Sequence, residues 1–343
     1  MPVTISLGEN RSRGATNSCF RRRLQQAVAR AAAAAMLVGV FSASQAQAAN
    51  TLTITNYGIS GVSLPWAVAQ EKGFIKKNGV KYDGIIGSHG GGTSIRNLMA
   101  SDLKVGQVAV SAAVAAIQHG YDLIFIYSPV NNAGGLSWMV KADSPLKTIK
   151  DLKGKKASYS NPRSTTEMML RMALERNGME KEVQMVSSGG VAAGLTLLGQ
   201  GAVDAAPVDE PQLMPAGKYR VLFHVNQYLP HLTWEIGVTT RAYAKAHPAT
   251  VRGIVRAWQE AVKYVYAHPD EAEKIYAKTF NTKIEVAKKI VPELLASHYY
   301  SEGNFNAEGL KTMIDGLKLV GSLQKPFDVD KAIDKSYLAK DLQ

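Results

Sequence analysis

The sequence predicts an α/β fold in which mostly parallel sheets are flanked by helices. Short apolar or alternating segments, typical of strands, are separated by segments of helical periodicity between Thr51 and Thr239. From Val251 onward the patterns are helical. Strands that alternate with helices favour parallel pairing, and ligand sites in such sheets lie at the carboxyl ends of the strands.

The first 48 residues have the features of an export signal. Four arginines between Arg21 and Arg30 precede an apolar run at 31–43, and a small-x-small pattern ends at Ala48. The run is shorter than the roughly 20 residues that a membrane-spanning helix needs. We therefore expect cleavage after Ala48 and an exported protein, with the Sec and twin-arginine routes both open.

Composition excludes several classes of function for the exported chain. Cleavage lowers the formal charge from +12 to +7, and no dense basic cluster interleaved with aromatic residues predicts nucleic-acid binding. The only cysteine, Cys19, lies in the predicted leader. The exported chain therefore has no thiol chemistry, zinc–thiolate site or disulfide, and we expect no metal and no cofactor.

Hydrophobic periodicity and the positions of glycine and proline predict the strands and helices of the first half. Strands are predicted at 51–55, 81–86, 105–110 and 123–127, and helices begin at Leu64, in the His89–Ser94 loop and near Ser111. The loop His89-Gly90-Gly91-Gly92-Thr93-Ser94 matches neither the phosphate-loop nor the dinucleotide pattern. Two alternatives remain for it, a plain tight turn or a loop whose N–H groups face a ligand.

The stretch from Ser144 to Glu167 predicts an anion site. A short helix at 148–153 and a strand at 155–159 lead into a polar turn, and Ser164 with Glu167 has the spacing of a capping box. The first N–H groups of a helix have no intrahelical partner and favour anions, and Arg163 adds a charged fork beside them. The alternative is that Ser164 only caps the helix and that Arg163 is a solvated surface residue.

The remaining elements complete the pattern. Strands are predicted at 183–187, 219–225 and 234–239, with a helix at 191–198. In the last third, a stripe that includes Trp258 predicts a helix packed on the core, and Thr282 with Glu285 predicts a second capping box.

Three segments carry a family resemblance. The segments 147–156, 199–205 and 209–211, behind a signal peptide, resemble the nitrate/sulfonate/taurine group (NMT1/THI5-like) of periplasmic substrate-binding proteins of ABC importers. The resemblance implies a type II fold of two lobes joined by a hinge, with the ligand bound between them. The implied divisions are a first lobe at 49–139, a second at 140–235, and a return to the first lobe with C-terminal helices at 236–343.

The resemblance also implies the site. Carried over position by position, the candidate ligand-binding residues are Asn56, Tyr57, Gly58, Ser60, Gly92, Thr93, Ser111, Tyr127, Asn131, Ser160, Arg163, Ser164, Thr165, Glu210 and Trp234. Of the aromatic residues, Tyr57, Trp66, Tyr127 and Trp234 are expected to cover an apolar tail. The segment 100–107 departs from the glycine and acidic motif that the family has there, which weakens the carry-over for the first lobe.

These observations predict capture of a ligand rather than chemistry. We expect a monomeric solute-binding protein that takes up a small organic anion, of sulfonate or carboxylate type, and delivers it to a membrane permease driven by a cytoplasmic ATPase. Two alternatives stay open. An enzyme like the thiamine-pyrimidine synthases is disfavoured by the leader and the lack of cysteine, whereas a periplasmic sensor would use the same site.

Overall fold

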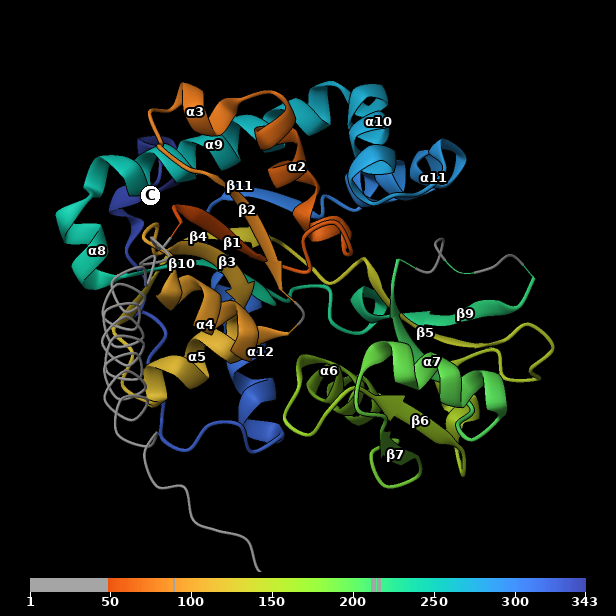
Figure 1. The fold of residues 1–343 in the computed structure, drawn as a ribbon. Coiled ribbons are helices and arrows are strands. Elements are labelled where there is room, and N and C mark those ends of the chain that lie inside the picture. Colours follow the sequence, from red (N-terminus) through yellow and green to blue (C-terminus); the bar gives the residue numbers. More distant parts are fainter. Residues whose placement is uncertain (1–48, 89, 211–213, 215–216) are drawn as a thin grey trace, which may run out of the picture. The chain divides into compact units, whose positions relative to one another are not determined.

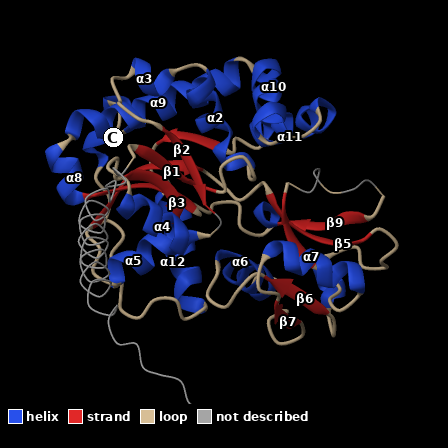
Figure 2. Cartoon of the chain, in the orientation of Figure 1, coloured by secondary structure: helices blue, strands red, loops and turns tan. Residues whose placement is uncertain are grey.

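The described part of the chain is an α/β structure, as the sequence predicts. The computed structural model describes residues 49–88, 90–210, 214 and 217–343. The predicted signal peptide, His89 and Pro211 lie outside these residues. Figure 1 shows the order of the elements along the chain, and Figure 2 separates the strands from the helices that flank them.

The largest sheet has six strands. Its strands are β1 (Thr51–Thr55), β2 (Gly84–Ser88), β3 (Val105–Ala109), β4 (Leu123–Val130), β10 (Glu235–Thr240) and β11 (Tyr300–Gly303), in the spatial order β11-β4-β10-β3-β1-β2. β1 pairs in parallel with β2 and β3. β10 is antiparallel to both of its neighbours, and β11 is antiparallel to β4.

The middle of the chain forms two smaller sheets. One has the order β8-β5-β9, and the other pairs β6 with β7. The bounds are β5 (Leu136–Lys141), β6 (Lys156–Tyr159), β7 (Gln184–Ser187), β8 (Ala206–Asp209) and β9 (Tyr219–His224). A parallel bridge between Ala157 and Ala205 joins β6 to the start of β8, so the five strands follow one another as β7-β6-β8-β5-β9.

The two sets of strands repeat one arrangement. The spatial order is β2-β1-β3-β10-β4 in the first set and β7-β6-β8-β5-β9 in the second. In each set, the fourth strand in this order runs opposite to its two neighbours. The reversed strand is β10 in the first set and β5 in the second. Each is the first strand after the chain passes from one set to the other, at 131–135 and at 225–234. Most strands of each set thus run in one direction, as the sequence predicts, and the strand that crosses over from the other set enters in the opposite direction.

The helices surround these sheets. They are α2 (Leu64–Glu71), α3 (Phe74–Lys77), α4 (Gly91–Ala100), α5 (Val110–Gln118), α6 (Thr165–Glu175), α7 (Val191–Gln200), α8 (Arg241–Ala246), α9 (Pro248–Ala267), α10 (Pro269–Thr279), α11 (Ile284–Ala296) and α12 (Ala307–Leu319). Short 3-10 turns are η1 (Gly61–Ser63), η2 (Ile149–Leu152), η4 (Val225–Gln227), η5 (Lys335–Tyr337) and η6 (Lys340–Leu342). In the described part of the chain, no helix is long and apolar enough to cross a membrane.

Most element predictions hold within a few residues. The strand β11 interrupts the last third, which was expected to be helical. The lobe boundaries at 139–140 and 235–236 stay predictions. The second capping box was also wrong: α11 begins at Ile284 after Lys283, without a side-chain cap, because the turn through Asn281 carries Thr282 outside the helix.

A buried aromatic cluster packs the six-stranded sheet against α2 and α9. The rings of Trp66, Tyr127 and Trp258 lie with centroids 5.3–6.3 Å apart, and all three side chains are fully buried. This confirms the predicted core position of Trp258. On β10, Gly237 is required here, since a Cβ at that position would lie 1.9 Å from Cε1 of Tyr127.

Candidate functional site

The loops after β1 and β2 are tied together where the strands end. Asn56 adopts a left-handed backbone (φ 54°), and its N–H donates to the Ser88 carbonyl at 3.0 Å. The Ser94 hydroxyl lies 2.6 Å from the hydroxyl of Thr55 and 2.7 Å from that of Ser88. Ser94 therefore fixes the start of α4 to both strands, and the predicted loop at 56–60 turns directly beside it.

The glycine run at the start of α4 serves packing. A Cβ on Gly91 would lie 2.3 Å from the Cβ of Ala112, so glycine allows α4 to approach α5 closely. Gly92 and Thr93 occupy the first turn of α4, and the Thr93 hydroxyl accepts from Arg96 at 2.9 Å. No side chain caps this N-terminus. The tight-turn alternative thus has a physical reason, while ligand contact stays a prediction.

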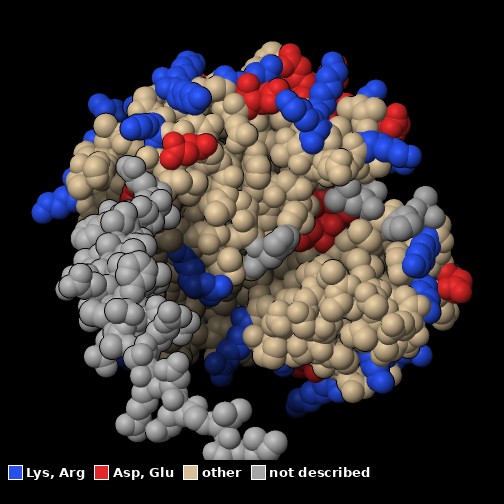
Figure 3. Space-filling view, viewed as in Figure 1, with Lys and Arg blue, Asp and Glu red and all other residues tan. Residues whose placement is uncertain are grey.

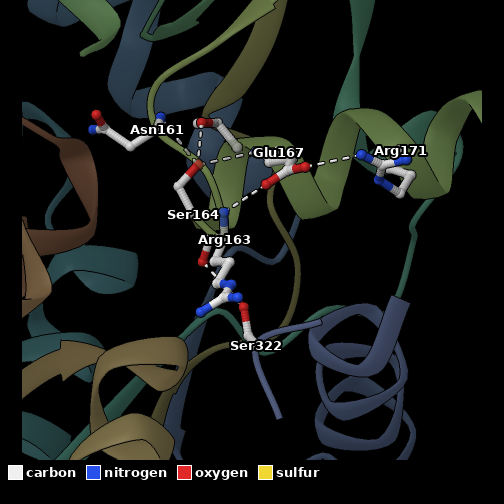
Figure 4. Close-up of polar contacts among 7 residues, drawn as sticks. Asn161, Arg163, Ser164, Glu167, Arg171 and Ser322 are labelled. Carbon is white, nitrogen blue, oxygen red and sulfur yellow. Dashed lines mark hydrogen bonds and ion pairs between the residues drawn. The ribbon is translucent and has the colours of Figure 1, made fainter. Parts of the chain in front are cut away.

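Figure 4 shows the N-terminus of α6. The Ser164 hydroxyl accepts from the Glu167 N–H at 3.1 Å, which confirms the predicted cap. The Glu167 carboxylate does not accept from the Ser164 N–H, as the second hydrogen bond of a capping box would require. It accepts instead from the Arg163 N–H at 2.5 Å and from the Arg171 guanidinium at 2.9 Å.

Arg163 is held by its backbone and free at its side chain. Its φ of 63° is left-handed, its N–H is bound by Glu167, and its carbonyl accepts from the Ser322 hydroxyl at 3.3 Å. In Figure 4 its side chain extends away from the Glu167–Arg171 pair. The side chain is exposed, and its guanidinium has no hydrogen-bond or ion-pair partner among the described residues. It is therefore available to an external anion.

Hydrogen bonds bring predicted residues of the two sets of strands together. The Ser111 hydroxyl, on the first turn of α5, lies 3.2 Å from the Thr165 hydroxyl, on the first turn of α6. The Gly61 N–H donates to Oε1 of Glu210 at 2.8 Å, although the two residues are 149 positions apart. The starts of α5 and α6 thus meet at one contact, and the end of β8 meets η1 at another; that these residues form one ligand site stays a prediction.

Several predicted residues hold the fold together. Asn131 donates from its side-chain amide to the carbonyls of His298 and Tyr300, which anchors β11. The Ser160 hydroxyl lies 2.7 Å from that of Thr166. The Gly58 N–H donates to the Ser63 hydroxyl at 3.2 Å. These contacts give each residue a structural role, and its contact with a ligand stays a prediction.

The predicted aromatic residues separate into two groups. Trp66 and Tyr127 are fully buried, and both donate to Oε1 of Gln107, at 2.9 and 3.1 Å. They belong to the core and drop out of the candidate site. Because they are only partly buried, Tyr57 and Trp234 remain candidates to cover a ligand. The indole N–H of Trp234 also has no partner among the described residues.

Glu210 is the most constrained of the predicted residues. It is 1% exposed, its φ is 45°, and its N–H donates to the Gly135 carbonyl at 2.9 Å. Burial, reinforced by the neighbouring Asp209, raises the pKa of Glu210 well above its ordinary value. Burial also raises the pKa of Asp209 to about 6 and that of Glu235, on β10, to about 8.

A cavity of about 360 Å³ lies beside Glu210. Its lining residues are Gly134, Gly135, Glu210, His224, Asn226, Gln227, Ile290, Glu293, Leu294 and Ser297. Of these only Glu210 was predicted from the sequence. The others come from three separate segments without a shared motif, so no local pattern could have grouped them. Among the described residues, no cluster of acidic, histidine or cysteine side chains could hold a metal ion.

The surface charge is dispersed. On the face shown in Figure 3, lysine and arginine side chains are scattered instead of gathered in one dense patch. Several are paired with acids at the surface, such as Lys72 with Glu271 and Lys278 with Glu71. Such exposed pairs contribute little to stability.

Comparisons with known proteins agree with this architecture. The sequence model of the family described as NMT1/THI5 like matches residues 61–272. The periplasmic aliphatic sulphonate-binding protein SsuA from Escherichia coli superposes with a TM-score of 0.70, at 20% identity over 83% of this chain and 92% of that one. The alkanesulfonate-binding protein SsuA from Xanthomonas axonopodis pv. citri, bound to MOPS, gives 0.69 at 17% identity, over 85% and 100%.

An enzyme shares the same fold. The desulfurization enzyme DSZB superposes with a TM-score of 0.56, at 14% identity over 84% of this chain and 97% of that one. No curated protein matches the chain. At such identities the structural likeness shows the fold of periplasmic binding proteins, and activity must be argued from the site.

Proposed function

The chain belongs to the NMT1/THI5-like family, and from this premise we propose that it is the solute-binding component of an ABC importer. It captures a small organic anion of sulfonate or carboxylate type between two lobes in the periplasm. The closed form then docks on a membrane permease that a cytoplasmic ATPase drives. Ligand contacts made by both lobes favour closure over the open form.

The observation that carries the anion proposal is the N-terminus of α6. Among the described residues, the N–H groups of Thr165 and Thr166 have no acceptor, and the Arg163 guanidinium has no partner. Unpaired helix N–H groups and an arginine fork together favour an oxyanion. The Thr165 hydroxyl, on the first turn of α6, lies 3.2 Å from the Ser111 hydroxyl, and both can reorient toward a ligand.

The rest of the ligand is expected to be apolar. Tyr57 and Trp234 are partly buried aromatic side chains of the predicted site, and an aromatic face covers an alkyl or aryl tail. The Xanthomonas protein of this fold is bound to MOPS, which is a sulfonate. A sulfonate is therefore the first probe to use.

Calorimetric titration of the purified protein tests this function. The panel contains alkanesulfonates, carboxylates, nitrate and neutral pyrimidines, and the variant is Arg163→Ala. Loss of a charge-assisted contact is expected to weaken binding of the anion by roughly ten- to hundredfold. The matched control is Arg241→Ala. Arg241 is an exposed arginine at the start of α8, and it is paired with Asp122.

Each outcome is informative. If Arg163→Ala binds every anion as tightly as the parent does, the anion site at α6 is wrong. If only neutral heterocycles bind, the solute-binding role stands and the anion class falls.

An enzymatic role is the second candidate, because DSZB shares the fold. The only cysteine of the chain is Cys19, in the predicted leader, so a thiol nucleophile is not available to the predicted exported protein. A ligand found by calorimetry should therefore be recovered unchanged after prolonged incubation, as followed by NMR. Conversion into a product would favour the enzyme.

A further inference from the structure

Glu210 connects the two sets of strands at the turn η1. Its Oε1 accepts from the Gly61 N–H at 2.8 Å, and the Tyr300 hydroxyl donates to the Gly61 carbonyl at 2.7 Å. The Gly61 peptide is thus held by the second set through Glu210 and by the first set through Tyr300, on β11.

The contact is tight and strained. A Cβ on Gly61 would lie 2.6 Å from Oε1 of Glu210 and 2.8 Å from Cδ1 of Leu294, so only glycine permits this approach. Glu210 itself has a left-handed φ of 45°, which a non-glycine residue adopts at a cost. Strain of this kind persists only where the surroundings enforce it, and it concentrates at functional and switching positions.

Among the described residues, no positive charge compensates the carboxyl of Glu210. Its Oε2 is buried without a partner among the described residues. The titratable groups that face it are the preceding residue Asp209, at the end of β8, Tyr276 on α10, Tyr299 just before β11, and Tyr300 on β11. His224 and Glu293 line the same cavity. No lysine or arginine is among the residues that line this cavity. Ionisation of Glu210 would therefore place an uncompensated charge in the interior.

We propose that Glu210 is a proton-linked latch between the two lobes, which closes on Gly61 as a neutral acid and is released when the carboxyl ionises. The proposal rests on the proposed function, since it describes the regulation of the same ligand site. A neutral carboxyl keeps the Oε1 acceptor and avoids a buried charge. An ionised one gains free energy from water, which it reaches only if the lobes separate.

The direction of the effect follows from the environment. Burial raises the pKa of Glu210 above the ordinary value of 4.5, so the neutral and latched form persists above that pH. Rising pH then favours the open form. Ligand capture by closure accordingly becomes weaker as pH rises.

The distance between two spin labels measures the latch without any ligand. The labels are placed by Lys76→Cys, on α3, and Lys181→Cys, before β7, in the full chain carrying Cys19→Ser; both lysines are exposed. The parent is expected to gain a longer-distance population as the pH rises from about 5 to about 9. Glu210→Gln keeps an oxygen acceptor and cannot ionise, so it should keep the short distance throughout.

The matched control is Glu235→Gln. Glu235 is another buried acid, but its carboxylate is bound by Gln107 within the six-stranded sheet, and it should respond as the parent does. A pH response that Glu210→Gln retains, or that Glu235→Gln abolishes in its place, overturns the proposal. So does a parent that shows no response.

A second measurement covers the case in which Glu210→Gln does not fold. In the unmodified protein, the Gly61 amide should lose hydrogen-exchange protection with rising pH faster than the amide of Val238, in β10, does. Equal pH dependence of the two amides contradicts the latch. Because neither measurement uses a ligand, failure of the latch is distinct from failure of anion binding, which calorimetry at one pH decides.

Discussion

Replacing Glu235 by glutamine should remove a pH-dependent instability. Glu235 is fully buried, its Oε2 accepts from Nε2 of Gln107 at 2.6 Å, and its Oε1 has no partner among the described residues. Burial raises its pKa from 4.5 to about 8. Glutamine has the same shape and keeps one oxygen for Gln107, but it cannot ionise.

The sign and size follow from linkage. Between pH 4.5 and about 8 the unfolded chain has lost this proton and the folded protein has kept it, so the free energy of unfolding falls as pH rises. One group contributes about 1.4 kcal/mol per pH unit in this window. Between pH 5.5 and pH 7.5 the parent should therefore lose about 3 kcal/mol through Glu235, and the variant should not.

Urea unfolding at those two pH values measures the difference. Asp209 and Glu210 shift in the same direction, so the variant keeps part of the parental slope. The control is Glu285→Gln, which changes an exposed acid in the first turn of α11 and should keep the whole slope. Equal slopes for Glu235→Gln and the parent would refute the assignment of a buried, protonated Glu235.

Three further changes test local features by urea or thermal unfolding. Ser164→Ala removes the hydroxyl that accepts from the Glu167 N–H and should lower the free energy of unfolding by about 1 kcal/mol. Thr282→Ala should change it by less than about 0.5 kcal/mol, since Thr282 caps no helix; a loss as large as that of Ser164→Ala would restore the second capping box. Gly237→Ala should cost about 2 kcal/mol or more, because the new Cβ overlaps the buried ring of Tyr127, and a neutral effect would contradict that packing.

Features that depend on short stretches of sequence could be predicted before the structure was known. The strands at Thr51–Thr55 and Val105–Ala109 and the helix after Ser164 were predicted closely, because side-chain period and capping act within a few residues. Apart from Cys19, in the predicted leader, the sequence has no cysteine, so composition alone predicts an exported protein without thiol chemistry. The capped helix start directly after Arg163 is likewise a property of one short segment.

The sequence by itself determined which segments form most of the strands and helices and where α6 begins. Only the tertiary structure decided the direction of β5 and β10, the burial of Trp66 and Tyr127, the cavity, and the contact of Glu210 with Gly61. The first group depends on neighbours within a turn or a strand. The second depends on residues as far as 149 positions apart, whose proximity is set by the packing of the whole chain.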